Sequence, residues 1–321
     1  MRILQVGPRE AGQRLDRLLE KYMQLAPKSF IYKMLRKKNI KLNNRRASGS
    51  ERLRDGDEIT LYLSDDTIDG FCRERRQAVT DRISLDIVFE DEDILVINKP
   101  AGMLSQKADK DDISLVEYVE GYLEEVSGTG VFRPGICNRL DRNTSGLVVA
   151  GKSVQGLQWM NQLFRERDLK KYYLCLVYGN VDRETHLRGY LRKDKRNNIV
   201  EVLEQQLTGA VKIETAYVPL GSAQYQGEAY TLLKVHLITG RSHQIRAHLA
   251  SIGHPIVGDA KYGPKGKNAL ARRQLLHAWR MEFGVPEYLP ERYQGCCFEA
   301  GLPKQFDEVL QKMGIWPAER M

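Results

Sequence analysis

The spacing of apolar residues separates a short helical segment at the start of the chain from a strand-rich remainder. Apolar side chains recur at helical spacing over residues 15–22 and again over residues 30–35, which predicts two short amphipathic helices. Short strands are expected over 39–42 and 58–63, with a turn at 43–44 after the first and another at 54–57 before the second. Two helices and a small sheet within residues 1–64 predict an independent α/β module.

The segment 65–80 is polar, mixed in charge and without a period, which is typical of a linker. From residue 81 onward, apolar runs predict more strands than helices, and the strands do not alternate strictly with helices. Strands are expected over 85–89, 94–98, 147–150, 172–178, 211–218 and 230–237, and helices over 157–164 and from Ser242 to Gly253. We therefore expect an α+β fold with a mixed, mainly antiparallel sheet in a domain spanning 81–321.

Positive charge is concentrated in the predicted module. Residues 14–54 contain thirteen Lys and Arg side chains against three acidic ones, a net charge of +10, whereas the whole chain carries +8. A solvated, soluble helix face would explain a charge run alone. Here the charge lies on amphipathic helices, and Lys and Arg that neutralise phosphates release counterions, so a polyanion is the expected partner.

The module resembles a known RNA-binding fold. The order RLDRLLEKY, KSFIYKMLRKKNIKLNNRRA and LRDGDEITLYL is similar to the small RNA-binding module first described in the fourth protein of the small ribosomal subunit. The resemblance covers about residues 12–64. It implies RNA bound along the second helix and the turn after it, near Lys33, Arg36, Lys37 and Lys41.

Composition excludes several classes of protein. No stretch approaches the roughly 20 apolar residues of a membrane span, and the first ten residues lack the apolar core of a secretory signal. Five cysteines form neither a disulfide framework nor a CxxC pair, and no glycine-rich phosphate loop occurs. We expect a cytoplasmic monomer without a nucleotide cofactor.

The densest polar cluster, residues 137–147, precedes an apolar strand. Asp141 lies there between Arg139 and Arg142, and neighbouring positive charge favours an ionised carboxylate. Such a carboxylate is a usable nucleophile or base. The alternative is that Asp141 only orders the turn through hydrogen bonds and an ion pair. This segment alone leaves both interpretations open.

A second polar segment, residues 239–249, opens the helix expected from Ser242. Arg246 follows the apolar Ile245 by about 100° around that helix, at the border of its buried face. A buried arginine needs an acidic partner, and Asp141 is the candidate. His243 and His248 are about 140° apart on the helix, which does not suit a shared ligand, so we expect no metal.

Taken together, these segments resemble an RluA-type pseudouridine synthase. The matching stretches are VINKPAGMLSQ (96–106), NRLDRNTSGLVVAGKS (138–153), KKYYLCLVYG (170–179), TGRSHQIRAHLASIGHPIVGDAKYG (239–263) and LLHA (275–278). The resemblance implies a cofactor-free isomerisation of uridine in RNA. Large-subunit ribosomal RNA is the expected substrate, because family members with this two-domain layout usually act there. One position departs from the family's pattern, since Asn138 stands where the family usually has His.

The resemblance also implies roles for individual residues. Asp141 becomes the catalytic aspartate, Tyr173 the tyrosine beside the flipped base and Arg246 the partner of the aspartate; without the resemblance, Tyr173 would be a core aromatic. The remaining polar positions are expected to contact RNA: Arg139, Arg142, Lys171, Arg241 and His243. Alternatives are an RNA-binding or ribosome-assembly factor with an idle site, a synthase acting on transfer RNA, and a nucleosidase that releases uracil.

Overall fold

The computed structural model describes the chain except residues 73–83, 110–111, 128–131, 195–198, 265–269 and 316–321. Two compact units result. One comprises 1–96, 106–138 and 149–162, and the other comprises 97–105, 139–148 and 163–321. None of the helices in the described ranges is both long and apolar enough to cross a membrane.

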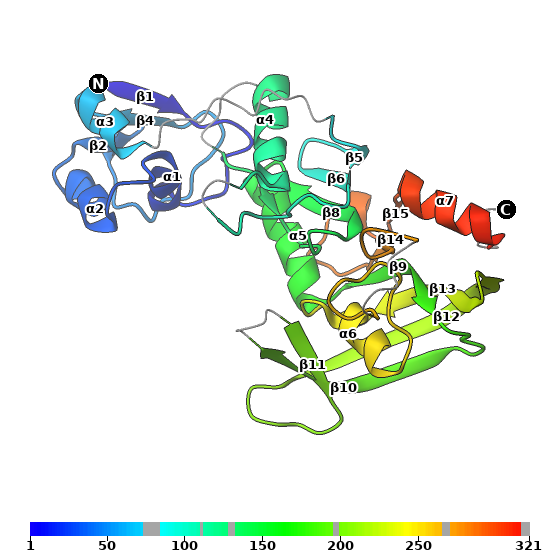
Figure 1. Cartoon of the computed structure of the whole chain (residues 1–321). Coiled ribbons are helices and arrows are strands. Elements are labelled where there is room, and N and C mark those ends of the chain that lie inside the picture. Colours follow the sequence, from blue (N-terminus) through cyan, green and yellow to red (C-terminus); the bar gives the residue numbers. More distant parts are fainter. Residues whose placement is uncertain (73–83, 110–111, 128–131, 195–198, 265–269, 316–321) are drawn as a thin grey trace. The chain divides into compact units, whose positions relative to one another are not determined.

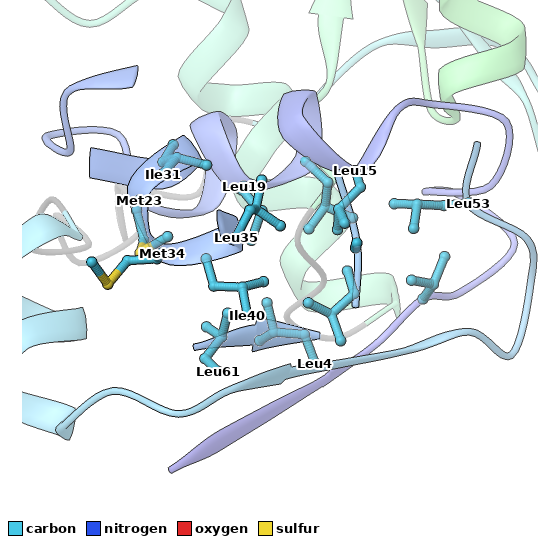
Figure 2. Close-up of a cluster of buried hydrophobic side chains, with 14 of the residues drawn as sticks. Leu4, Leu15, Leu19, Met23, Ile31, Met34, Leu35, Ile40, Leu53 and Leu61 are labelled. Atoms are coloured by element: carbon cyan, nitrogen blue, oxygen red, sulfur yellow. The ribbon is translucent and has the colours of Figure 1, made fainter. Parts of the chain in front are cut away.

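The N-terminal module has its own core, and its helices and strands are labelled in Figure 1. Its elements are β1 (Arg2–Gln5), α1 (Leu15–Tyr22), α2 (Lys28–Arg36), β2 (Ile40–Leu42), β3 (Arg45–Arg46), β4 (Glu58–Leu61) and α3 (Asp65–Phe71). The strands form one sheet in the order β1-β4-β2-β3. Figure 2 shows the inner faces of α1 and α2 meeting this sheet through residues such as Leu19, Leu35 and Ile40. The helices predicted from the apolar spacing are confirmed.

The expected linker begins with a short helix instead of an irregular segment. Ser64 caps α3, because its hydroxyl accepts a hydrogen bond from the Thr67 N–H, and Ile68 is buried in the module's core. The polar composition of 65–71 hid this helix, whose contacts with the core come from Ile68 and from Phe71 at its end. The remainder of the expected linker, from residue 73, lies outside the described residues.

The rest of the chain is strand-rich. Its elements are β5 (Ile87–Glu90), β6 (Ile94–Lys99), α4 (Leu115–Ser127), β7 (Gly135–Ile136), β8 (Ser145–Gly151), α5 (Val154–Glu166), β9 (Leu169–Tyr178), β10 (Thr185–Asp194), β11 (Ile199–Leu203), β12 (Val211–Tyr225), β13 (Glu228–Leu237), α6 (Gln244–Ser251), β14 (Leu276–Phe283), the short 3-10 helix η1 (Glu291–Tyr293), β15 (Cys297–Glu299) and α7 (Lys304–Met313). The second unit holds the run β11-β10-β12-β13-β9-β14, with β15 beside β14.

All neighbours in that run are antiparallel, while β14 pairs with β8 in parallel. The predicted α+β class with a mixed, mainly antiparallel sheet is confirmed. One face of β9 and β13 packs against α7, where Leu174, Leu176 and Leu232 cluster with Phe306 and Leu310. The adjacent residue Tyr173 points the other way, because side chains alternate across a strand.

Gly146 is required where β8 runs beside β14. Its φ of +112° is unfavourable for other residues, and a Cβ there would lie 2.2 Å from the Ala278 carbonyl oxygen. We expect Gly146→Ala to lower the free energy of unfolding by about 3 kcal/mol, because strain and overpacking add. Thermal unfolding measures this, with Gly227→Ala as the control, since Gly227 has φ +80° and open space around it. Equal losses in both variants would contradict the role of the close strand contact.

Candidate active site

A turn immediately before β8 holds Asp141 in the second unit. The Thr144 N–H donates to the Asp141 carbonyl at 3.0 Å and closes the turn. The Asp141 side chain remains one quarter exposed. The carboxylate is therefore fixed by its backbone yet open to a reactant.

Arg246 brings this carboxylate and a second one together. Its Nη1 donates to Asp141 Oδ2 at 2.8 Å, while Nε and Nη2 donate to Asp259 Oδ2 and Oδ1 at 2.7 and 2.8 Å. The Asp259 side chain is fully buried. Hydrogen bonds from Arg246 overcome the opposing effect of burial and lower the pKa of Asp259. The guanidinium is thus held in one orientation by Asp259 and offers its remaining edge to Asp141.

The predicted pair of Asp141 and Arg246 is present, but Asp259 is the stronger partner and sequence reasoning missed it. Two parallel hydrogen bonds fix a guanidinium plane better than a single one. Asp259 lies in a turn after α6, where its Oδ1 also accepts from the Lys261 N–H at 2.9 Å. The signal available in the sequence was an acid directly after Gly258 within an otherwise apolar stretch.

Helix α6 carries Arg246 and is itself fixed by Gln244. The buried Gln244 amide donates to the Glu214 carbonyl and to Thr215 Oγ1, both at 2.9 Å. Its carbonyl oxygen accepts from Thr239 Oγ1 at 2.9 Å and from the Arg241 N–H at 3.1 Å. All four hydrogen-bonding positions of this amide are filled, so the start of α6 is anchored to β12.

Tyr173 lies on β9 between β13 and β14, opposite Val235 and Ala278. It is buried, and burial, followed by the negative charge of Asp141, raises the pKa of its phenol above the ordinary value. The side chain is therefore neutral and largely apolar, and it lies close enough to Asp141 for the carboxylate charge to raise its pKa. This placement agrees with either a stacking surface for a base or a core aromatic.

Lys99 is a further residue near Asp141 that sequence reasoning did not single out. Its buried ammonium donates to the carbonyls of Pro100, Met103 and Arg142 at 3.0, 2.8 and 3.3 Å. Burial lowers the pKa of Lys99 to about 7, and the charge of Asp141 opposes this shift. Lys99 ties the loop after β6 to the turn that presents Asp141.

The other predicted RNA contacts of the body differ in exposure. Arg139, Arg142 and Arg241 are exposed, whereas Lys171 is partly buried. Burial and the nearby Arg167 lower the pKa of Lys171. His243 has 13% of its side chain accessible, and it faces Asp141. In the other unit, the Asn138 side chain accepts a hydrogen bond from the Val149 N–H at 2.9 Å, which anchors the backbone beside β8.

Three of the four predicted module residues share one face at the end of α2. Lys33, Arg36 and Lys37 are exposed at the end of α2, at positions three and four residues apart. Lys41 follows on β2, and its ammonium lies 4.9 Å from the centre of the Tyr62 ring. The four cations thus come from two consecutive elements of the module.

Comparison with known proteins decides the family. The family model described as RNA pseudouridylate synthase matches residues 93–251. An uncharacterized RNA pseudouridine synthase of Mycoplasma genitalium is 34% identical over 86% of this chain and 87% of its own length. The chain belongs to the RNA pseudouridine synthase family. The synthase is thus an enzyme of the isomerase class that acts on RNA.

Other relatives agree with this assignment. The ribosomal large subunit pseudouridine synthase D of Nitrosomonas europaea is 29% identical to the synthase, over 96% of this chain and 86% of the relative. Among solved structures, human RNA pseudouridylate synthase domain containing 4 shares the fold with a TM-score of 0.57 and 20% identity, covering 71% of this chain and 92% of that one. The matched stretch 93–251 includes Asp141, Tyr173 and Arg246.

Proposed function

We propose that the synthase converts uridine to pseudouridine in large-subunit ribosomal RNA, with Asp141 as the reacting carboxylate. One observation carries the proposal. The partly exposed Asp141 carboxylate accepts a hydrogen bond from Arg246 Nη1 at 2.8 Å, and the buried Asp259 holds that arginine in place. A preorganised cation beside a carboxylate fixes the orientation of that carboxylate without reorganisation during the reaction.

The reaction needs no added group. The bond between N1 of uracil and C1′ of the ribose breaks, the base turns, and C5 bonds to C1′; the C5 proton leaves and N1 gains one. Asp141 either attacks C1′ or assists formation of a glycal, and both routes need the ionised carboxylate. A stacked base is out of reach, so the uridine must flip out of the RNA at a cost of a few kcal/mol. Tyr173 is proposed to contact the flipped base.

The N-terminal module is proposed to supply RNA affinity. Residues 1–64 would act as an RNA-binding domain joined through 65–80 to a catalytic domain spanning 81–321, with Arg139, Arg142, Lys171 and Arg241 as phosphate contacts near the site. A monomer would suffice, because Asp141, Tyr173 and Arg246 belong to one chain. Ribosomal RNA as substrate would place the reaction in the cytoplasm.

Replacing Lys33, Arg36, Lys37 and Lys41 together with Gln tests the module's role. We expect weaker RNA binding and a slope of log affinity against log salt reduced by about three, because each lost phosphate contact removes about 0.7 to 0.9 from the slope. Filter binding across a salt series measures both. The control replaces the exposed Lys304 and Lys312 on α7 with Gln, which should leave the slope unchanged. An unchanged slope in the fourfold variant would refute the assignment.

The alternatives make different products. A binding or assembly factor with an idle site would bind RNA and leave every uridine intact. A nucleosidase would release free uracil, whereas an isomerase retains it. Incubating purified protein separately with ribosomal and transfer RNA, then analysing nucleosides and free base, distinguishes these outcomes. We expect pseudouridine in ribosomal RNA and no uracil; modification confined to transfer RNA would overturn the proposed substrate.

A further inference from the structure

His243 has a strained backbone beside the reacting carboxylate. Its φ of +56° is in the left-handed region, which residues other than glycine seldom adopt, and it directly precedes the first residue of α6. Its side chain makes no capping hydrogen bond to the helix. Strain of this kind persists where the surrounding structure enforces it, and it is concentrated at functional sites.

The hydroxyl of Tyr262 determines which imidazole nitrogen carries the proton. This oxygen accepts a hydrogen bond from the Val200 N–H at 2.8 Å and lies 3.0 Å from Nδ1 of His243. Among the described residues these are its two hydrogen-bond partners, so the single hydroxyl proton is directed at Nδ1. A neutral His243 therefore accepts at Nδ1 and carries its proton on Nε2.

That Nε2 faces the reacting carboxylate. It lies 3.9 Å from Asp141 Oδ2, the oxygen that already accepts from Arg246. The distance exceeds an N–H···O hydrogen bond by about 1 Å, so a small rotation of either side chain would close it. No described residue donates a hydrogen bond to the other oxygen, Oδ1.

The surroundings favour a neutral imidazole. Burial is the largest influence and lowers the pKa of His243 below its ordinary value. Arg246 and Lys261 act in the same direction, while Asp141 and Asp259 oppose it. A neutral, largely buried imidazole is a poor phosphate ligand, so a phosphate contact is not the role that its surroundings favour.

We propose that His243 is a positioning residue of the active site, held by Tyr262 so that its Nε2–H donates to Asp141 Oδ2 when the flipped uridine is bound. Two donors, Arg246 and His243, then fix Oδ2 and leave Oδ1 to react. Tyr262 contacts both donors, because its hydroxyl holds His243 and its ring centre lies 5.2 Å from the Arg246 guanidinium. This inference rests on the proposed function of Asp141.

Steady-state kinetics on ribosomal RNA with His243→Leu, His243→Gln and Tyr262→Phe test the proposal. For His243→Leu we expect kcat to fall about tenfold or more with KM nearly unchanged, because the reacting oxygen loses its alignment. His243→Gln should recover most of this loss, since its amide N–H can occupy the Nε2 position. Leu and Gln have similar backbone strain at this φ, so their comparison isolates the donor.

Tyr262→Phe keeps the ring beside Arg246 and removes the hydroxyl. It should lower kcat severalfold in the wild-type background and have no further effect in His243→Leu, because the hydroxyl acts through the imidazole. Thermal unfolding of each variant verifies folding. A raised KM with unchanged kcat in His243→Leu, an inactive but folded His243→Gln, or additive effects of the two substitutions would overturn the inference. A wild-type enzyme that makes no pseudouridine would instead overturn the proposed function.

Discussion

Asp141→Asn is expected to abolish pseudouridine formation while RNA binding and folding are preserved. The amide has the shape of the carboxylate and can still accept from Arg246 Nη1, but it can neither attack C1′ nor remove a proton. A loss of about 10³-fold or more in kcat is expected. Tritium release from RNA labelled at C5 of uridine measures the reaction, because that position loses its hydrogen.

The control for this prediction is Asp182→Asn. Asp182 is an exposed aspartate outside the site, so the same chemical change there should leave kcat unaltered. Filter binding should give the same RNA affinity for wild type and both variants. Substantial tritium release by Asp141→Asn would show that another group performs the reaction.

Arg246→Met is expected to have the second largest effect, and it combines lost activity with lost stability. Removing the guanidinium leaves Asp259 fully buried without its charged partner, which costs roughly 3 to 5 kcal/mol. Asp141 loses its cation at the same time, so kcat should fall by about 10² or more. Thermal unfolding and the tritium assay measure the two losses separately.

The pH dependence of that stability loss has a definite sign. The pKa of Asp259 is lower in the folded wild-type protein than in the unfolded chain. Its pairing with Arg246 therefore stabilises the fold at pH values above its pKa in the unfolded chain, and this stabilisation is lost as the pH falls through its pKa in the folded protein. In Arg246→Met the buried carboxyl instead has to release its proton without a charged partner as the pH rises. The difference in stability between wild type and variant should therefore grow from about pH 4 to pH 7. A constant difference across that range would contradict the buried ion pair.

The sequence predicted those parts of the fold that have a strong local pattern. The helices α1 and α2, and the strands β9, β12 and β13, show clear apolar periods. Strand β14 was not predicted, because its apolar stretch is interrupted by Arg280 and Glu282 on a partly solvated face. Helix α3 was hidden by its polar composition, as Ile68 and Phe71 are its two large apolar residues and both pack against the module's core.

The active site was predictable only in part, for a related reason. Arg246 was predicted at the border of a buried helix face, where an arginine needs an acidic partner. Asp141 was chosen as that partner because it was already the candidate reacting carboxylate. Nothing local shows that Asp259, thirteen residues after Arg246, folds back onto the same guanidinium. The role of Tyr262 depends likewise on a backbone N–H from β11, more than sixty residues earlier in the chain.

The most direct test of the central claim maps pseudouridine at nucleotide resolution in ribosomal RNA from three strains. One strain expresses the wild-type protein, one expresses Asp141→Asn at the same level, and one lacks the gene. We expect at least one large-subunit uridine to be modified only in the wild-type strain. Identical maps in all three strains, or a modification restored by Asp141→Asn, would contradict the account.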